Sequence, residues 1–134
     1  MTGQDYYFNS PEGDFHYLDW GGKGPLTHIA PATGLCAGAY DKVATGLLPH
    51  FHIVGLDLRG HGRTGITANP KHLNNWDVFY RDLEHFFNYL EQPIIAIGHS
   101  MGGTVSLRLA VQRPEMFTAL VLIEPGLMPP AWRP

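Results

Sequence analysis

The 134-residue sequence has a single cysteine, Cys36, so no disulfide can form within the chain. It has no apolar run long enough to cross a membrane, and residues 1–5 lack the basic start and apolar stretch of a secretory signal. It has no basic cluster, and its formal net charge is −3, which argues against electrostatic attraction to nucleic acid or to an anionic membrane. From these absences we expect a cytoplasmic protein with no membrane or nucleic-acid partner.

The composition is that of a globular protein, with 44% hydrophobic and 16% charged residues. The chain is long enough to bury one core, and no repeat, low-complexity tract or linker divides it. We therefore predict a single domain over residues 1–134. The one shift in composition is a proline-rich stretch at residues 124–134, which reads as irregular chain after the last strand.

The most informative stretch, Ile94–Gly103, joins a β-branched run to a segment of helical length. Its middle reads Gly-His-Ser-Met-Gly, with Gly98 and Gly102 two positions either side of Ser100. Small residues at those positions allow a sharp turn between a buried strand and a helix. Such a turn holds the serine in a strained conformation, with its hydroxyl exposed at the carboxyl end of the sheet. The N–H of Met101, in the first helical turn, then lies beside it as a donor to developing negative charge.

This motif, with its flanking strand and helix, resembles the nucleophile elbow of the α/β-hydrolase family of serine hydrolases. The resemblance implies an α/β fold, a mostly parallel sheet with helices on both faces. It also implies hydrolysis of a small carboxylic ester without cofactor or metal, in which Ser100 attacks the carbonyl carbon. The glycines do not follow the spacing of a dinucleotide-binding loop, so no nucleotide site is expected.

Hydrophobic patterns predict the order of elements around that turn. Two aromatic-rich strands, at 6–8 and 15–20, are separated by turn-forming residues and predict a hairpin. Further strands are expected at 26–30, 52–56, 94–97 and 118–123, with helices at 39–48, 76–90 and 104–112. The alternation from the third strand onward predicts a parallel sheet with right-handed crossovers. This order matches the first six strands of an α/β hydrolase, without the lid and the last two strands.

Two of these segments also predict how they are buried. Apolar residues in 76–90 recur at three- and four-residue spacing, which predicts an amphipathic helix packed on the sheet. Segment 118–123 is almost continuously apolar, which predicts a strand covered on both faces.

The loop after the third strand reads Ala-Thr-Gly-Leu-Cys at residues 32–36. In the family this loop commonly carries His-Gly, and the residue after that glycine donates the second N–H of the oxyanion hole. The resemblance therefore assigns Gly34 to the turn and Leu35 as the donor that acts with Met101. Thr33 stands where the family usually has histidine.

Residues 57–64 read Asp-Leu-Arg-Gly-His-Gly-Arg-Thr and resemble a turn found in many α/β hydrolases. Asp57, Arg59 and His61 invite a catalytic interpretation. A glycine-rich loop at a strand end, however, needs such side chains to satisfy its own backbone. We interpret this turn as scaffold.

A serine hydroxyl needs a base within hydrogen-bond reach and a carboxylate that orients the base. The family order along the chain is serine, acid, histidine, yet all eight histidines of this sequence precede Ser100. His61 is the best substitute, because it lies on a loop at the right end of the sheet, whereas His99 is expected to point away from its neighbour. Glu124 directly follows the last strand, where some branches of the family place the acid, and it is our candidate for that role.

We expect the isolated chain to be impaired as an enzyme, because the sequence reads as the amino-terminal part of a hydrolase. The open edge of the sixth strand predicts self-association or pairing with a complementing chain. Two alternatives stay open. One is a catalytically inactive α/β module that acts through partner binding, and the other is different chemistry on the same fold, such as thioester or carbon–carbon bond hydrolysis.

Overall fold

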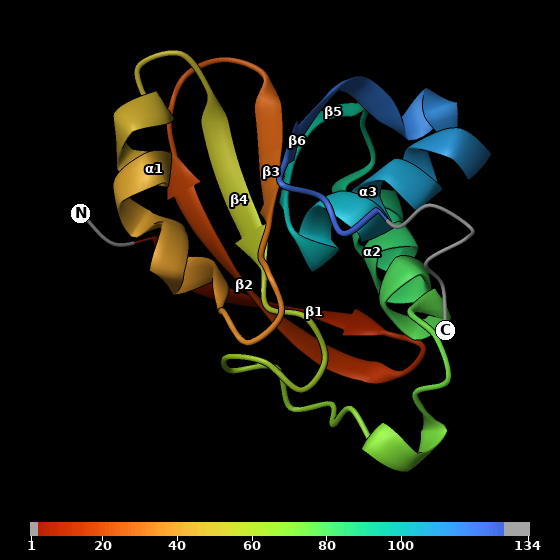
Figure 1. The fold of residues 1–134 in the computed structure, drawn as a ribbon. Helices are drawn as coiled ribbons and strands as arrows, with labels where there is room; N and C mark the ends of the chain where they lie inside the picture. The colour runs from red at the N-terminus through yellow and green to blue at the C-terminus, as the bar shows by residue number, and fades with distance from the viewer. Residues whose placement is uncertain (1–2, 128–134) are drawn as a thin grey trace.

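The computed structural model describes residues 3–127, which form a six-stranded sheet with α-helices on both sides (Figure 1). The strands are β1 (Gln4–Ser10), β2 (Gly13–Gly21), β3 (Leu26–Ala30), β4 (His52–Leu56), β5 (Ile94–His99) and β6 (Phe117–Ile123). The helices are α1 (Asp41–Leu47), α2 (Asp77–Leu90) and α3 (Met101–Gln112), and short 3₁₀ turns occur at η1 (Ala37–Tyr40), η2 (Pro70–His72) and η3 (Pro114–Met116). The strand order across the sheet is β1-β2-β4-β3-β5-β6.

The strand pairing confirms the predicted topology. β1 and β2 form the expected antiparallel hairpin, and β2 also pairs antiparallel with β4. From there β4, β3, β5 and β6 are parallel neighbours. The carboxyl ends of these four strands therefore meet at one edge of the sheet, where Ser100 follows β5.

The helices divide the molecule into three layers. α1 lies on one face of the sheet, and α2 and α3 lie on the other (Figure 1). The larger core cluster packs between the sheet and the α2–α3 layer, where Phe86 and Leu109 are fully buried. The smaller cluster, which includes Trp20 and Ile53, lies on the α1 side. The predicted cover on both faces is thus confirmed.

Helix α2 is amphipathic, as its spacing predicts. Its buried apolar residues are Phe79, Leu83, Phe86 and Phe87. Asp82 is buried beside them, with only 1% of its surface exposed, although the pattern places it on the polar side of the helix. A buried carboxylate needs a partner, and the partner of Asp82 is Arg59, in the turn at residues 57–64.

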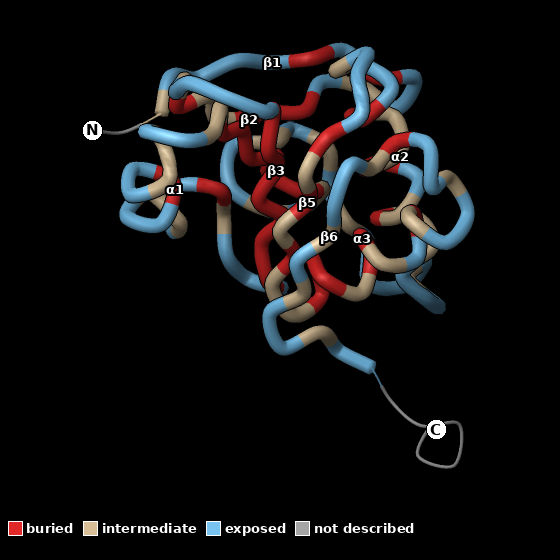
Figure 2. The backbone as a smooth tube through the Cα atoms, turned by 90° about the horizontal axis from the view of Figure 1, so that it is seen from above, coloured by how far each residue is buried: buried red, intermediate tan, exposed pale blue. Residues whose placement is uncertain are grey.

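β6 differs from its prediction. Val121 and Ile123 are each 46% exposed, and no strand within residues 3–127 pairs with the outer edge of β6 (Figure 2). One face of β6 packs on the layer of α2 and α3 through Phe117 and Leu120. On the opposite face of the sheet, α1 lies on the side of β2 and β4, away from β6 (Figure 1). The apolar run therefore does not reflect cover on both faces within the described residues.

Several helix boundaries also differ from those predicted from the sequence. The segment after β3 begins with the 3₁₀ turn η1, so α1 is shorter than the predicted 39–48. α3 begins at Met101 rather than at residue 104, because the sharp turn passes directly into the helix. The proline-rich stretch lies mostly outside the described residues.

Candidate active site

Ser100 lies between the last residue of β5 and the first residue of α3, at the apex of a sharp turn. Its φ of 51° and ψ of −119° form a conformation that residues other than glycine rarely adopt. Its N–H donates to the carbonyl of Ile123 at 3.0 Å, and its carbonyl accepts from the N–H of Thr104 at 3.1 Å. The predicted strand, turn and helix are therefore present, with a half-buried serine at the apex.

The glycines on either side of Ser100 are required by backbone packing. A β-carbon on Gly98 would lie 2.4 Å from the Cα of Gly103, and one on Gly102 would lie 2.2 Å from the carbonyl oxygen of Ala30. Both contacts are with main-chain atoms, which cannot turn aside as a flexible side chain would. The start of α3 thus approaches β3 and β5 too closely for any side chain at these positions.

Met101 opens α3, and its N–H donates no hydrogen bond to any residue in the range 3–127. Its side chain is buried, and its Sδ accepts a hydrogen bond from the Thr33 hydroxyl at 3.3 Å. The first N–H groups of a helix have no intrahelical partner and carry partial positive charge. A donor is therefore available next to Ser100, as the motif predicts.

Tyr40 connects the loop after β3 to the elbow. Its hydroxyl accepts from the N–H of Ala32 at 2.9 Å and lies 2.7 Å from Nδ1 of His99. The tautomer of the His99 ring decides which of the two groups donates in this second pair. Sequence reasoning missed Tyr40, since nothing in the local pattern shows that its hydroxyl reaches the end of β5.

The same loop holds Gly34 and Leu35, the residues predicted to form the second half of the oxyanion hole. The Leu35 N–H donates to the carbonyl of Ala32 at 3.1 Å, and the Gly34 N–H donates to Nε2 of His61 at 2.9 Å. Gly34 does occupy the turn, with a φ of 83° that favours glycine. Both N–H groups are donated within the protein in this structure, and the assignment of Leu35 as the second donor stays a prediction.

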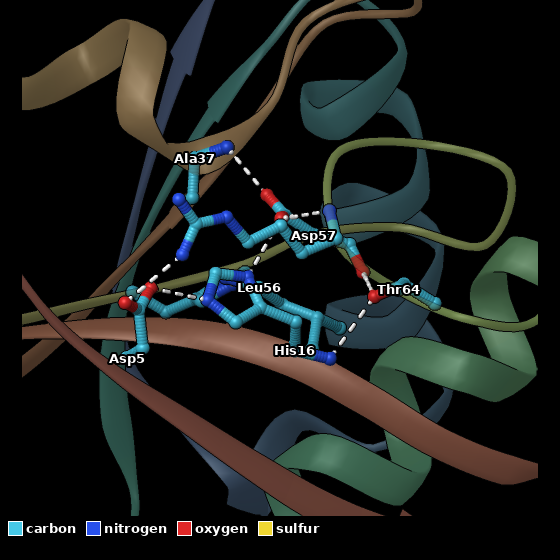
Figure 3. Close-up of polar contacts among 8 residues, drawn as sticks. Asp5, His16, Ala37, Leu56, Asp57 and Thr64 are labelled. Carbon is cyan, nitrogen blue, oxygen red and sulfur yellow. Dashed lines mark hydrogen bonds and ion pairs between the residues drawn. The ribbon is translucent and has the colours of Figure 1, made fainter.

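The turn at residues 57–64 is built around the buried carboxylate of Asp57 (Figure 3). Its two oxygens accept from the N–H of Ala37 at 2.7 Å and from the N–H of Arg63 at 2.9 Å. The scaffold interpretation is confirmed for Asp57, which fixes the turn to the start of η1.

His16 on β2 extends this network to the hairpin. Its Nδ1 lies 2.7 Å from Asp57, and its Nε2 lies 2.7 Å from Asp5 on β1 (Figure 3). The hydrogen bond from His16, with help from Arg63, lowers the pKa of the Asp5 carboxyl. This cluster could not be read from the sequence, because its members come from separate strands and loops.

Arg59 reaches away from its own turn. Its Nε and one terminal nitrogen donate to the two oxygens of Asp82 at 2.7 Å and 2.8 Å, and the same terminal nitrogen donates to Glu12 at 3.2 Å. Burial raises the pKa of Asp82, and the hydrogen bonds from Arg59 oppose that shift. The expectation that Arg59 satisfies the backbone of the turn is therefore wrong, because it clamps the turn to α2 instead.

No histidine within residues 3–127 hydrogen-bonds to Ser100. The best substitute predicted from the sequence, His61, donates from Nδ1 to a carbonyl of its own turn and accepts at Nε2 from Gly34. Nδ1 of His99 is hydrogen-bonded to the Tyr40 hydroxyl described above. His28 is fully buried, and burial lowers its pKa to about 3. The histidines that sequence reasoning could offer as the base are thus engaged elsewhere.

Glu124, the candidate acid, directly follows Ile123, whose carbonyl holds the main chain of Ser100. It is exposed, has a φ of 48°, and makes no hydrogen bond or ion pair with residues 3–127. Its main chain therefore lies at the elbow, and its role as the acid stays a prediction.

Residues 3–127 contain no group of three or more His, Cys, Asp or Glu side chains arranged to hold a metal ion. Within the same range, the helices are too short or too polar to span a membrane.

The parallel sheet, the helices on both faces and the strained serine after β5 define an α/β hydrolase. The chain belongs to this family: the family model described as serine aminopeptidase, S33, matches residues 29–132. A monoglyceride lipase of Rattus norvegicus is 31% identical over 115 residues, which are 77% of this chain and 35% of the lipase. A type I acyl-CoA thioesterase of Penicillium roqueforti is 33% identical over 121 residues, which are 79% of this chain and 28% of the thioesterase. The chain thus spans about a third of the length of the curated relatives it matches.

Solved structures give the same fold. An N-formylmaleamic acid deformylase from Pseudomonas putida superposes with a TM-score of 0.86 at 23% identity, covering 98% of this chain and 50% of the deformylase. The thioesterase domain of the curacin biosynthetic pathway superposes with a TM-score of 0.87 at 22% identity, covering 98% of this chain and 48% of that domain.

Proposed function

We propose that this chain carries the nucleophile of a serine hydrolase that cleaves carboxylic esters, with Ser100 as the attacking residue. The observation that carries the proposal is the strained backbone of Ser100 at the start of α3, beside the unpartnered N–H of Met101. The Ser100 oxygen would attack the carbonyl carbon, and the hydroxyl proton would pass to a base. Met101 would then donate to the tetrahedral oxyanion, a contact worth about 3 kcal/mol of transition-state stabilisation.

The base in this proposal comes from outside the 134 residues. Support comes from the histidines themselves, because His61 and His99 are already hydrogen-bonded and His28 is buried with a depressed pKa. Glu124, beside the elbow at the end of β6, would orient that base. The base would finally return its proton to the leaving alcohol, and water would release the acyl group from Ser100 by the reverse sequence.

The ester is favoured as substrate because several of the most similar relatives are named monoglyceride lipases. Thioester hydrolysis is the second candidate, and the likeness to an acyl-CoA thioesterase supports it. Both reactions pass through the same acyl-serine intermediate, so Ser100 and Met101 would keep their roles. Comparing turnover of matched ester and thioester substrates separates the two.

Fluorophosphonate labelling tests the nucleophile. Ser100 should form a phosphonyl ester with loss of fluoride, slowly in the isolated chain and faster when imidazole is added as a substitute base. Intact-mass measurement should show one added phosphonyl group in the native chain and none in Ser100→Ala.

Ser106→Ala is the matched control for that experiment. Ser106 lies on the same helix, and its buried hydroxyl has no hydrogen-bond partner within residues 3–127, so its removal should leave both fold and labelling intact. Labelling that persists in Ser100→Ala, or that imidazole does not accelerate, would contradict the proposal.

The edge of β6 supports a further part of the proposal. We propose that it pairs with a second strand, which in the isolated chain comes from another copy. An unpaired strand edge presents free N–H and C=O groups, and Val121 and Ile123 add exposed apolar surface.

Sedimentation should therefore show concentration-dependent association of the isolated chain. Val121→Lys should weaken that association by about tenfold or more, because the contact would have to bury a charge. Val111→Lys on α3 is the control, since Val111 is 74% exposed and lies on a helix rather than on the β6 edge. A chain that stays monomeric at high concentration would rule out this pairing.

A further inference from the structure

His28, in the middle of β3, is a buried histidine that the proposed reaction does not use. Its ring is fully buried and lies against Phe86 and Phe87 of α2, with 5.4 Å between ring centroids in each case. The N–H of Leu56 donates to its Nε2 at 3.2 Å, so Nε2 carries a lone pair and the ring proton is on Nδ1. Nδ1 has no hydrogen-bond partner within residues 3–127. The site therefore accommodates a neutral ring and gives no acceptor to an imidazolium.

A second proton on His28 would have to go to Nε2, because Nδ1 already carries one. That proton and the N–H of Leu56 would then face each other as two donors, and their hydrogen bond would be lost. The positive charge would also lie in an apolar core, which is costly without a partner. Burial accordingly lowers the pKa of His28 from 6.5 to about 3. Protonation in mild acid therefore requires the ring to reach water first.

The charged groups around His28 do not offset such a charge. Its neighbours across the sheet are Val54 on β4 and Ala96 on β5. The ionisable residues of the surrounding elements are bonded to other groups: Asp82 and Glu84 of α2 to Arg59 and Arg113, His52 of β4 to Asp19, Asp57 after β4 to His16, His99 of β5 to Tyr40, and Tyr17, behind Phe86, to Tyr89. His85 of α2 can only add positive charge, and it acts on Asp82. Within residues 3–127, burial is thus the one cause of the lowered pKa of His28.

Helix α2 is the element whose movement would expose the ring. β3 lies inside the sheet, with main-chain hydrogen bonds to β4 on one edge and to β5 on the other. α2 is held on the sheet by side chains, among them Phe86, Phe87 and the ion pair of Asp82 with Arg59. Moving α2 should therefore cost less free energy than separating β3 from its neighbours.

We propose that His28 is an acid-sensitive switch whose protonation releases α2 from the sheet. In the released state the ring is in water and has its ordinary pKa of 6.5, so this state binds a proton that the closed state excludes. Release is then favoured progressively as the pH falls below 6.5, and the effect levels off near pH 3. Because α3 packs against α2 and begins at the turn of Ser100, the same movement would loosen that turn.

Hydrogen exchange followed by mass spectrometry tests the release. Between pH 7 and pH 5, peptides of α2 should lose protection by about tenfold or more in the native protein, relative to His28→Gln at the same pH. The glutamine amide oxygen can take the place of Nε2 and accept from Leu56, but it does not titrate. Comparison at equal pH cancels the change of the intrinsic exchange rate with pH.

Two controls accompany this comparison. Peptides of α1, which lies on the opposite face of the sheet, should respond equally in the native and glutamine proteins (Figure 1). His72→Ala removes an exposed histidine on η2 and should behave as the native protein does. Equal protection of α2 in the native and glutamine proteins at pH 5 would overturn the proposal. An acid-induced loss that is as large in α1 as in α2 would also overturn it, because the whole chain would then open together.

If His28→Gln does not fold, nuclear magnetic resonance of the ring nitrogens in the native protein decides. His28 should be neutral in the folded protein at pH 5, with its proton on Nδ1, and an imidazolium there would overturn the proposal. These measurements follow α2 and the His28 ring rather than the reactivity of Ser100. The switch can therefore fail while the proposed function holds, or hold while that function fails.

Discussion

Gly102→Ala is expected to lower the free energy of unfolding by about 3 kcal/mol and to abolish labelling of Ser100. The new β-carbon would lie 2.2 Å from the carbonyl oxygen of Ala30 and 2.5 Å from its carbon. Relief requires α3 to move away from the end of β3, and that movement carries Met101 away from the loop. Urea unfolding followed by circular dichroism measures the first effect, and intact mass after fluorophosphonate treatment measures the second.

Gly46→Ala is the matched control for this change. Gly46 lies in α1, and apart from its chain neighbours and the backbone of its own helix no atom comes within 4 Å of the place that an alanine β-carbon would take. Alanine should therefore fit there and should stabilise the helix by roughly 0.5–1 kcal/mol. A Gly102→Ala protein with native stability would show that α3 and β3 do not pack as closely as the structure has them.

Arg59→Ala should destabilise the protein by about 3–5 kcal/mol at neutral pH, because it leaves the buried carboxylate of Asp82 without its partner. Asp82 is 1% exposed and receives two hydrogen bonds from Arg59. Arg63→Ala is the comparison, because the Arg63 side chain is 67% exposed and its ion pair with Asp5 lies at the surface. That change should cost about 1 kcal/mol or less.

The loss in Arg59→Ala should depend on pH. Burial already raises the pKa of Asp82, and removal of Arg59 should raise it further. A carboxyl whose pKa is raised on folding stabilises the folded state at low pH, and that contribution disappears as the pH rises through the folded pKa. The deficit should therefore be small in acid, where Asp82 is protonated in both proteins, and should grow towards neutral pH. A deficit that is constant with pH would show that lost packing, rather than the unpaired charge, is responsible.

The parts of the fold that follow from local sequence were predictable. The elbow needs small residues at 98 and 102, and the glycines there indicate it, because the constraint acts over only five residues. The hairpin and the parallel sheet follow from turn-forming residues and from alternation of strands and helices. These features depend on neighbours in the chain, which the sequence displays directly.

The contacts of the loop between β3 and η1 were not predictable in the same way. Which N–H remains unpaired depends on Tyr40 and His61, and only the folded chain shows that their side chains accept from Ala32 and Gly34. The pair of Arg59 and Asp82 is a similar case, because its members are 23 positions apart. Helical spacing alone placed Asp82 among exposed residues. Long-range polar contacts of this kind carry no periodic signal.

The hydrogen bond from the Ser100 N–H to the carbonyl of Ile123 ties the proposed nucleophile to the last residue of an edge strand. Edge strands open at a lower free-energy cost than the centre of a sheet, so the Ser100 amide should exchange through local opening of β6 rather than through global unfolding. Any polypeptide that pairs with β6 would suppress that opening without touching the serine. The conformation of the turn at Ser100 should therefore depend on how well ordered the neighbouring strand is.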